Sequence, residues 1–215
     1  MVYQFLYKYQ RNIVDKYKSK SAFGLWTDMG TGKTPMSLAL AEVNDCDRLI
    51  IITLNPKTYE TITDEGSWKW WANKYKYDLT FYDKHDTAFG QNPSCFIINY
   101  ESLFERGKRK TQKVTLKHSL EQYALNCAGH NVALIVDESH KVKNLKSQQT
   151  TAIEKLQQLL ARKARLLKTY LLTGTPFTTA YIDLYSQLKL LDCELTKGQF
   201  IDYFCIRGEV KGLLG

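Results

Sequence analysis

The sequence has 215 residues with a formal net charge of +8, and 44% of the residues are hydrophobic and 13% aromatic. This length and apolar content are enough to bury one sizeable core, so we expect a single domain with peripheral elements. The five cysteines include no C-x-x-C pair and no histidine at zinc-like spacing, and no run approaches the roughly 18 apolar residues of a membrane span, which argues against a disulfide framework, a zinc cage and a membrane protein.

Strand-like and helix-like segments alternate along the chain. Short apolar runs predict strands at 22–26, 48–54, 78–82, 94–99, 131–136 and 168–173. Helices are predicted at about 7–18, 34–44, 68–76, 118–127, 146–162 and 180–191. Near-continuous apolar strands that alternate with helices indicate a parallel sheet covered on both faces, so the expected fold is a doubly wound α/β domain with a mostly parallel sheet.

The segment TDMGTGKT, residues 27–34, follows the predicted strand at 22–26 and leads into the next predicted helix. Glycines at positions 30 and 32 allow backbone amides to approach phosphate oxygens without a Cβ in the way, and the helix N-terminus adds partial positive charge. The strict phosphate-loop pattern has glycine where this chain has Thr27, so the assignment depends on the strand before the segment and the helix after it. We interpret the segment as a nucleotide-binding loop and not as a simple glycine turn.

Phosphoryl transfer also needs an acidic site that holds the metal and orients water. ALIVDESH, residues 133–140, supplies one, because Asp137 ends an apolar strand and Glu138 follows it. Lys33 would reach the β- and γ-phosphates, and Thr34 would ligate Mg²⁺. Asp137 would contact that ion indirectly, and Glu138 would polarise the attacking water. Taken alone, the segment fits an acidic turn that caps the next helix.

With QRN at 10–12 and LLTGTP at 171–176, these motifs resemble the ATPase motor of superfamily-two helicases, whose phosphate loop often lacks the first glycine. The resemblance is closer to the Swi/Snf-like branch. YKYQ stands at the start of the first predicted helix, DMGTGKT is similar to the D-E-M-G-x-G-K-T loop of that branch, and LLTGTPFTTAYIDLYSQLKLLD at 171–192 resembles its third motif. The resemblance covers nearly the whole chain and implies ATP and Mg²⁺ as cofactors.

The resemblance implies a role for each residue that matches a motif. The nucleotide would be bound by Gln10, Met29, Gly30, Thr31, Gly32, Lys33 and Thr34, with Gln10 at the adenine edge. Lys33, Asp137 and Glu138 would be catalytic, and Thr34 and Asp137 would hold the metal. His140, Thr173 and Thr175 would couple the nucleotide state to the bound nucleic acid. Alternatively, Gln10 could be an exposed helix residue and LLTGTP an ordinary turn at a strand end.

Two further segments match the family less directly. NPKTYE at 55–60 resembles the motif after the second strand, but an insertion separates it from the usual downstream tryptophan, Trp68. INYESL at 98–103 resembles the motif that touches the nucleic-acid backbone, which implies contacts from Asn99 and Tyr100. We interpret all three tryptophans of the WKWW segment as packing residues and assign them no role in the site.

Positive charge is concentrated in two segments. Residues 105–118 carry six lysines and arginines against one glutamate, and residues 141–168 carry eight against one, so the rest of the chain is net negative. Each segment alone is typical of a solvated loop or an exposed helix face. Because the first follows the 98–103 motif, it also predicts salt-sensitive, sequence-independent contact with phosphates. The basic residues expected there are Lys108, Arg109 and Lys110.

The resemblance extends to only the first of the two RecA-like lobes of such motors. Residues 1–215 are therefore expected to form a single N-terminal RecA-like ATP-binding domain without the second lobe. That lobe closes the ATP cleft and supplies arginine fingers, and loss of such an arginine costs roughly 10³–10⁵ in turnover. We expect the chain to bind ATP far better than it hydrolyses it.

The predicted function is the ATP-binding lobe of a DNA-dependent ATPase that translocates on double-stranded DNA. The expected location is the cytoplasm, that of the host cell if the chain is phage-encoded, and a second lobe could be supplied in trans. A catalytically silent, nucleotide-gated module that binds nucleic acid or protein is the alternative, and the sequence does not separate the two. A phosphate-loop kinase fits less well, because the chain has no acceptor lid and carries both DESH and LLTGTP.

Overall fold

The computed structural model describes residues 2–54, 67–76, 93–105, 114–177 and 181–205, and the backbone alone of 79–81. The helices are η1 (Val2–Phe5), α1 (Lys8–Tyr17), α2 (Lys33–Glu42), α3 (Trp68–Lys74), η3 (Tyr100–Ser102), α4 (His118–Asn126), η4 (Ser139–Val142), α5 (Gln148–Lys163), α6 (Asp183–Leu190) and α7 (Lys197–Phe204), where η denotes a 3₁₀ helix. The strands are β1 (Ala22–Trp26), β2 (Arg48–Thr53), β3 (Leu79–Phe81), β4 (Cys95–Asn99), β5 (Phe104–Glu105), β6 (Thr115–Leu116), β7 (Asn131–Asp137) and β8 (Leu166–Thr173). Over these ranges, no helix combines the length and the apolar character needed to cross a membrane.

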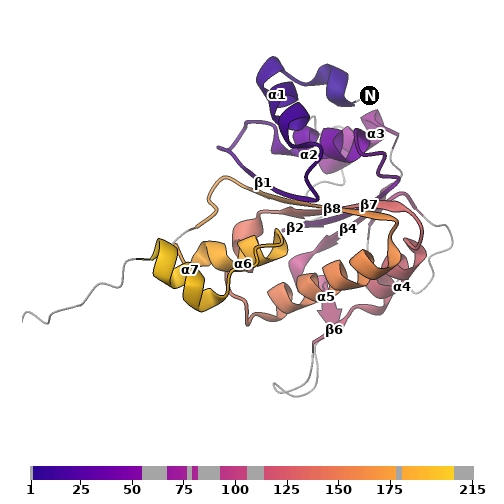
Figure 1. The fold of residues 1–215 in the computed structure, drawn as a ribbon. Helices are drawn as coiled ribbons and strands as arrows, with labels where there is room; N and C mark the ends of the chain where they lie inside the picture. Colours follow the sequence, from indigo (N-terminus) through magenta and orange to yellow (C-terminus); the bar gives the residue numbers. More distant parts are fainter. Residues whose placement is uncertain are drawn as a thin grey trace, which may run out of the picture.

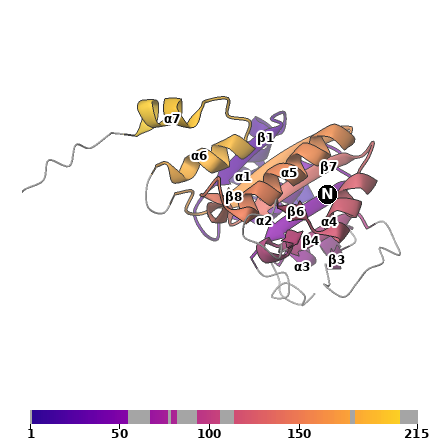
Figure 2. The same cartoon turned by 90° about the horizontal axis from the view of Figure 1, so that it is seen from below.

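A six-stranded sheet with the order β1-β8-β7-β2-β4-β3 forms the centre of the molecule, and all of its neighbouring strands run parallel. Figure 1 shows η1, α1, α2 and α3 on one face of this sheet and α4, α5 and α6 on the other. In Figure 2, seen from below, the helices of the second face lie over the strands. The predicted doubly wound α/β domain with a mostly parallel sheet is therefore confirmed.

Each face of the sheet has its own apolar core, because successive side chains of a strand point to opposite faces. In β2, Ile50 and Ile52 pack into the core under α4 and α5, whereas Leu49 and Ile51 pack into the core under α1 and α2. Helix α2 is buried at every position from Pro35 to Ala41. A helix that is apolar all round belongs in an interior, so α2 is fixed between the sheet and the N-terminal helices.

The carboxyl ends of the central strands meet at one edge of the sheet. Trp26 of β1 pairs with Thr173 of β8, and Asp137 of β7 pairs one residue earlier on β8. On the other side of β7, Thr53 of β2 pairs with Asn99 of β4. Because these strands are parallel and end in phase, the segments that follow them leave the sheet at the same edge.

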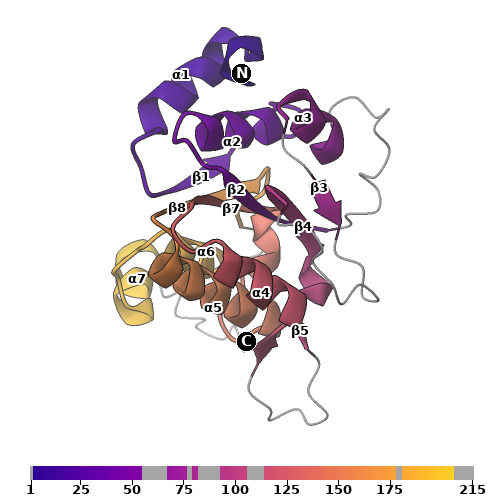
Figure 3. The ribbon, with the colours of Figure 1, turned by 90° about the vertical axis from the view of Figure 1, so that its right-hand side faces the viewer.

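The described structure contains elements that were not predicted, among them the 3₁₀ helices η1, η3 and η4. A two-stranded antiparallel pair, β5 with β6, was not predicted, because both strands are very short and flank the basic segment; Figure 3 shows β5 at the foot of the molecule, below α4. Helix α7 was also not predicted. It begins with a capping box in which Thr196 accepts a hydrogen bond from the amide of Gln199, while Gln199 accepts one from the amide of Thr196. That T-x-x-Q spacing was a usable sequence signal.

At the opposite edge of the sheet, hydrogen bonds around Asp47 connect the starts of two strands. Its carboxylate accepts from the Asn131 amide at 2.9 Å and lies 2.6 Å from His130 Nδ1, and its own amide donates to the Asn131 carbonyl. Burial acts to raise the pKa of Asp47, but the hydrogen bonds from His130 and Asn131 outweigh burial and hold this pKa below its usual value. These hydrogen bonds fix the starts of β2 and β7 relative to each other.

Asp47→Asn is expected to lower the free energy of unfolding at neutral pH and to weaken its dependence on acid. Because the folded state has the lower pKa, the carboxylate contributes stability above the unfolded pKa of about 3.9, and this contribution is lost as the pH falls through the folded value. Urea unfolding at pH 7 and at pH 3 measures both effects. Glu194→Gln, which removes the same charge from an exposed side chain elsewhere, is the control. Equal stability of the two variants at pH 7 would contradict the assignment.

Candidate nucleotide-binding site

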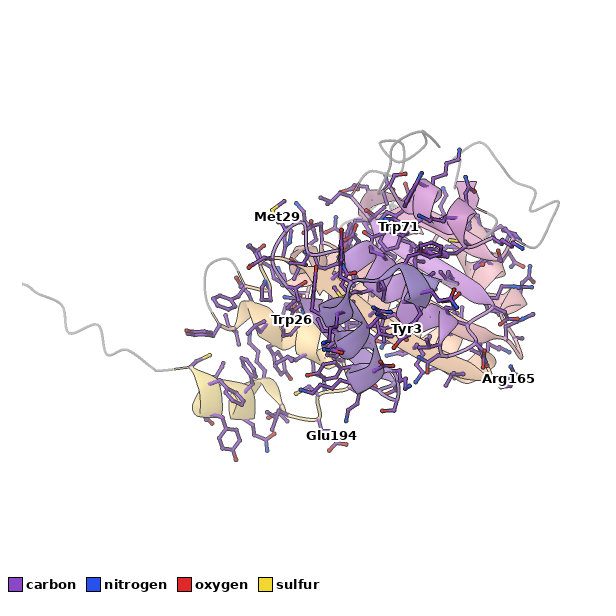
Figure 4. All side chains as sticks on the ribbon, turned by 90° about the horizontal axis from the view of Figure 1, so that it is seen from above. Tyr3, Trp26, Met29, Trp71, Arg165 and Glu194 are labelled. Carbon is purple, nitrogen blue, oxygen red and sulfur yellow. The ribbon has the colours of Figure 1, made fainter. Side chains whose placement is uncertain are left out.

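The phosphate loop after β1 and the LLTGTP turn after β8 are in direct contact at the carboxyl edge of the sheet. Gly174 packs so closely on the phosphate loop that a Cβ there would lie 3.3 Å from Met29 Cγ and 3.7 Å from the Thr27 carbonyl oxygen. Met29 itself is 85% exposed, and Figure 4 shows it projecting at the rim of the molecule. The structure therefore brings the first and third predicted motifs together.

Hydrogen bonds within the phosphate loop hold it in a closed turn. The hydroxyl oxygens of Thr27 and Thr31 are 2.7 Å apart, and Thr31 Oγ1 donates to the Asp28 carbonyl at 2.7 Å. The Lys33 ammonium donates to the carbonyls of Thr27 and Asp28, both at 2.9 Å. Thr27 thus replaces the first glycine of the strict pattern with a hydroxyl contact that closes the turn.

Gly30 and Gly32 both have left-handed backbone conformations, with φ of 77° and 82°. Such values favour glycine, which gives these two positions a second reason for glycine besides close approach to a phosphate. Gly32 is also the residue from which α2 begins, and no side chain caps that helix. The first amides of α2 therefore have no side-chain acceptor from a cap and remain available to an anion, with Lys33 and Thr34 in the same first turn.

Gln10 lies directly against the phosphate loop. Its side chain is only 4% exposed, its Nε2 donates to the Thr31 carbonyl at 2.9 Å, and its Oε1 accepts from the Tyr7 amide at 2.9 Å. A Cβ on Gly32 would lie 2.2 Å from Gln10 Nε2. The idea of an exposed helix residue is therefore wrong for Gln10, whereas its contact with adenine stays a prediction.

The carboxylate of Asp137 is partly buried and held by three donors. Oδ2 accepts from Trp68 Nε1 at 3.2 Å and from Thr53 Oγ1 at 3.1 Å, and Oδ1 accepts from the Glu138 amide at 3.1 Å. Burial raises the pKa of Asp137, while the hydrogen bonds from Trp68 and Thr53 oppose that shift. Trp68 was assigned no role from the sequence. The indole reaches the site from α3, which follows the predicted insertion. The downstream tryptophan of the family pattern was the sequence signal that could have assigned Trp68 to the site.

A chain of contacts through one nitrogen, His140 Nδ1, connects the DESH segment to the LLTGTP turn. His140 Nδ1 lies 3.1 Å from Glu138 Oε2 and 3.1 Å from Thr173 Oγ1, and Thr173 Oγ1 accepts from the Thr175 amide at 3.1 Å. Glu138 has a left-handed backbone, with φ of 53° and ψ of 49°. The structure thus brings together all three residues predicted to couple nucleotide to nucleic acid, with Glu138 at one end of the chain.

A second, largely buried polar connection was missed from the sequence. Ser139 Oγ donates to Gln187 Oε1 at 2.7 Å, and Gln187 Nε2 donates to the Pro176 carbonyl. Ser186 Oγ donates to the Val142 carbonyl. Helix α6 therefore ties η4 to the turn after β8. The polar pair Ser186 and Gln187 within an otherwise apolar helix face was the only sequence signal for it.

The structure gives different surroundings to the two residues of the 98–103 motif that were predicted to touch nucleic acid, Asn99 and Tyr100. Asn99 caps η3 by accepting from the Ser102 amide at 3.0 Å. The Tyr100 side chain is only 1% exposed, and its hydroxyl donates to the Asp137 carbonyl at 2.5 Å. In this structure the Tyr100 ring cannot touch a nucleic acid, so the prediction is confined to the main chain there. The predicted contacts Lys108, Arg109 and Lys110, and the NPKTYE segment, lie outside the described residues.

The residues present fit a magnesium–nucleotide complex better than a resident metal. Among the described residues, no group of three or more His, Cys, Asp and Glu side chains could hold a metal ion. Magnesium bound with a nucleotide usually takes only one or two protein ligands, the phosphates and waters completing its shell. The Thr34 hydroxyl and the ordered Asp137 carboxylate match that requirement. The open space at Gly30, where an added Cβ would contact nothing within 4 Å, leaves room for phosphate.

Comparison with known proteins gives one family. A family model described as the SNF2-related domain matches residues 4–201. No curated protein sequence matches the chain significantly. The family match covers every motif named above, from Gln10 to the LLTGTP turn.

Solved structures share the fold. The SWI2/SNF2 ATPase core of Sulfolobus solfataricus in complex with double-stranded DNA matches with a TM-score of 0.59 at 18% identity, over 92% of this chain and 38% of that chain. The core domain of the same ATPase gives 0.58 at 17% identity, over 90% and 36%. The Hef helicase domain of Pyrococcus furiosus gives 0.57 at 13% identity, over 87% and 36%. The chain thus spans well under half the length of these proteins. A phage origin finds no support in these matches.

Gly32→Ala is expected to weaken binding of Mg²⁺·ATP by roughly tenfold or more, equivalent to about 1.4 kcal/mol, because its Cβ would displace Gln10 and distort the loop. Gly129→Ala is the matched control, since Gly129 has a φ of 77° and open space around it. Both variants should lose about 1–2 kcal/mol of unfolding free energy from the left-handed backbone. Calorimetric titration and urea unfolding measure the two effects. Equal nucleotide affinities of the two variants would contradict the assigned loop.

Proposed function

Because the chain belongs to the SNF2-related domain family, we propose that it is the ATP-binding lobe of a DNA-dependent ATPase that translocates on double-stranded DNA. The observation that carries this proposal is the position of His140 Nδ1, which lies 3.1 Å from both Glu138 Oε2 and Thr173 Oγ1. This histidine joins the residue proposed to activate water to the turn that packs on the phosphate loop. A simple acidic helix cap would not require that connection.

The proposed chemistry is hydrolysis of the γ-phosphate of ATP. Lys33 and the first amides of α2 would bind the phosphate oxygens, and Thr34 and Asp137 would hold Mg²⁺, which when bound neutralises phosphate charge. Water would attack the γ-phosphorus as the bond to the β-phosphate oxygen breaks. Glu138 would accept the water proton, and the contact of its Oε2 with His140 would orient the carboxylate for this step. Gln10 would read the adenine edge.

Double-stranded DNA is the proposed partner. In support, the Sulfolobus solfataricus ATPase core with the same fold was solved in complex with double-stranded DNA, and this chain carries a net charge of +8. The main chain of 99–101 leaves the sheet at the same edge as the phosphate loop. Contact with the DNA backbone would be extended by Lys108, Arg109 and Lys110, giving binding through phosphates and not through base edges.

We further propose that residues 1–215 form a single RecA-like lobe and that a second lobe, from another chain or a longer form of this one, completes the motor. The chain spans only 36–38% of the related motor structures, in support of this division. A second lobe would close the ATP cleft and contribute arginine fingers. The isolated lobe should therefore turn over roughly 10³–10⁵ times more slowly than a complete motor.

Lys33→Ala is expected to weaken ATP binding by roughly 10–150-fold, since hydrogen bonds to charged groups contribute about 1.5–3 kcal/mol. ATP affinity and phosphate release, with and without double-stranded DNA, are the measurements. Lys163→Ala, an exposed lysine at the opposite edge of the sheet, is the control and should bind ATP like the wild type. An unchanged ATP affinity in Lys33→Ala would refute the proposed site.

The same assay separates the alternative function. DNA-stimulated phosphate release that is lost in Glu138→Gln would show that the chain completes its own catalytic site. Lys33-dependent ATP binding without any turnover, even when a second lobe is added, would favour a silent, nucleotide-gated module.

DNA binding is expected to be salt-dependent, because each neutralised phosphate contributes about −0.9 to the slope of log K against log salt concentration. Replacing Lys108, Arg109 and Lys110 by alanine should therefore make this slope less steep by about 2–3 and leave sequence preference unchanged. Replacing Lys20, Arg162 and Lys163 by alanine removes the same charge elsewhere and is the control. Fluorescence anisotropy over a salt series measures the slope, and an identical slope for both triple variants would exclude the proposed contact.

A further inference from the structure

We propose that the Tyr100 hydroxyl is a positioning group that couples the 99–103 segment to the backbone of Glu138. This inference rests on the proposed function, in which 99–101 touches DNA and Glu138 activates water. In this proposal Tyr100 touches neither DNA nor ATP, and it couples the binding of one to the binding of the other.

The hydroxyl of Tyr100 is placed between two carbonyl groups of the DESH segment. It lies 2.5 Å from the Asp137 carbonyl oxygen and 3.3 Å from the Glu138 carbonyl oxygen. These two carbonyls belong to the peptide planes on either side of the Glu138 Cα, and their orientation sets the φ and ψ angles of Glu138. One hydroxyl therefore contacts both planes that define the conformation of the proposed water-activating residue.

That conformation is one which the chain would not adopt without support. Glu138 has a φ of 53°, in the left-handed region that favours glycine. Local hydrogen bonds from the Glu138 amide to Asp137 Oδ1 and from the Lys141 amide to the Glu138 carbonyl support it. Both of these bonds are made within the segment itself. Tyr100 adds a support that comes from a different strand end, and so a route by which another part of the molecule can alter Glu138.

The other end of this connection is rigidly held. Tyr100 is the first residue of η3, whose N-terminus is capped by Asn99, and its ring is buried in the core beneath α4 and α5. The Leu103 carbonyl accepts from the Lys117 amide at 2.9 Å, which ties the end of this turn to the segment that follows β6. A displacement of the 99–103 main chain would therefore move the hydroxyl instead of being absorbed by a loose side chain.

The consequence concerns the Glu138 side chain. Its Oε2 lies 3.1 Å from His140 Nδ1 only while the left-handed backbone directs it there. Loss of the Tyr100 hydroxyl would leave both peptide planes with only their local hydrogen bonds, and the 99–103 segment could no longer act on the Glu138 carboxylate through them. Nucleotide and DNA would then bind independently, because coupling between two sites requires an element that both of them bias.

The test is the coupling factor between nucleotide and DNA, measured on Tyr100→Phe. The affinity of the whole chain for a mixed-sequence DNA duplex is determined with and without a non-hydrolysable ATP analogue and Mg²⁺. The wild type is expected to show a change of about fivefold or more, the lower range of allosteric coupling. Tyr100→Phe should reduce this ratio to near one. The affinity for each ligand alone is measured in parallel, so that a general loss of binding is distinguished from a loss of coupling.

Tyr123→Phe is the matched control. The Tyr123 hydroxyl is also buried and also lies between two carbonyl oxygens, those of Pro93 at 2.9 Å and Leu49 at 3.3 Å, at the opposite end of the strands. Tyr123→Phe should therefore lose stability in the same way and keep the wild-type ratio. Asn99→Ala, which removes the cap of η3 but keeps the hydroxyl, should give an intermediate ratio and serves if Tyr100→Phe does not fold.

The outcomes distinguish a failure of the positioning role of Tyr100 from a failure of the proposed function. A wild-type ratio in Tyr100→Phe, or an equal loss in Tyr123→Phe, would overturn the positioning role while leaving the proposed function intact. A wild type that binds both ligands without any coupling would also overturn it. A wild type that fails to bind the duplex would refute the proposed function itself, and the inference with it.

Discussion

Parallel pairing in phase is the constraint on which the rest of the molecule depends. Strands β1, β8, β7 and β2 end at one edge, so the phosphate loop, the DESH segment and the LLTGTP turn meet although they are far apart in sequence. Around Asp47 at the other edge, hydrogen bonds hold the starts of β2 and β7 in the same register. A slip of one residue would turn every side chain of a strand to the opposite face, so the register of the core is also the register of the site.

Most polar contacts at this edge are partly or fully buried, so the loss of any one of them would cost more free energy than at an exposed surface. Asp137 is held by an indole and a hydroxyl, Ser139 by the amide of Gln187, and Glu138 by a histidine that also reaches Thr173. An unpaired polar group in such surroundings is costly, so each partner constrains the next. The result is a connected set of groups in which movement of one turn disturbs the others.

Local sequence patterns predicted those features of the structure that depend on residues close together in the chain. The alternation of apolar runs predicted the sheet, and the glycine-containing segment between a strand and a helix predicted the tight turn in which Gly30 and Gly32 have positive φ. The contacts of Trp68 and Tyr100 with the DESH segment could not be read in the same way. They join residues that only the packing of α3 and β4 brings together, and an indole or a phenol in an apolar segment has the same pattern whether or not its polar atom has a partner.

Helix α2 has a consequence for how this molecule can move. It is buried continuously from Pro35 to Ala41, and close-packed interiors are poorly compressible. The helix that carries Lys33 and Thr34 therefore behaves as a fixed frame of reference. Any relative movement within the domain would therefore have to arise at the rim, in the short turns that follow the strands, while the first turn of α2 stays fixed against its own core.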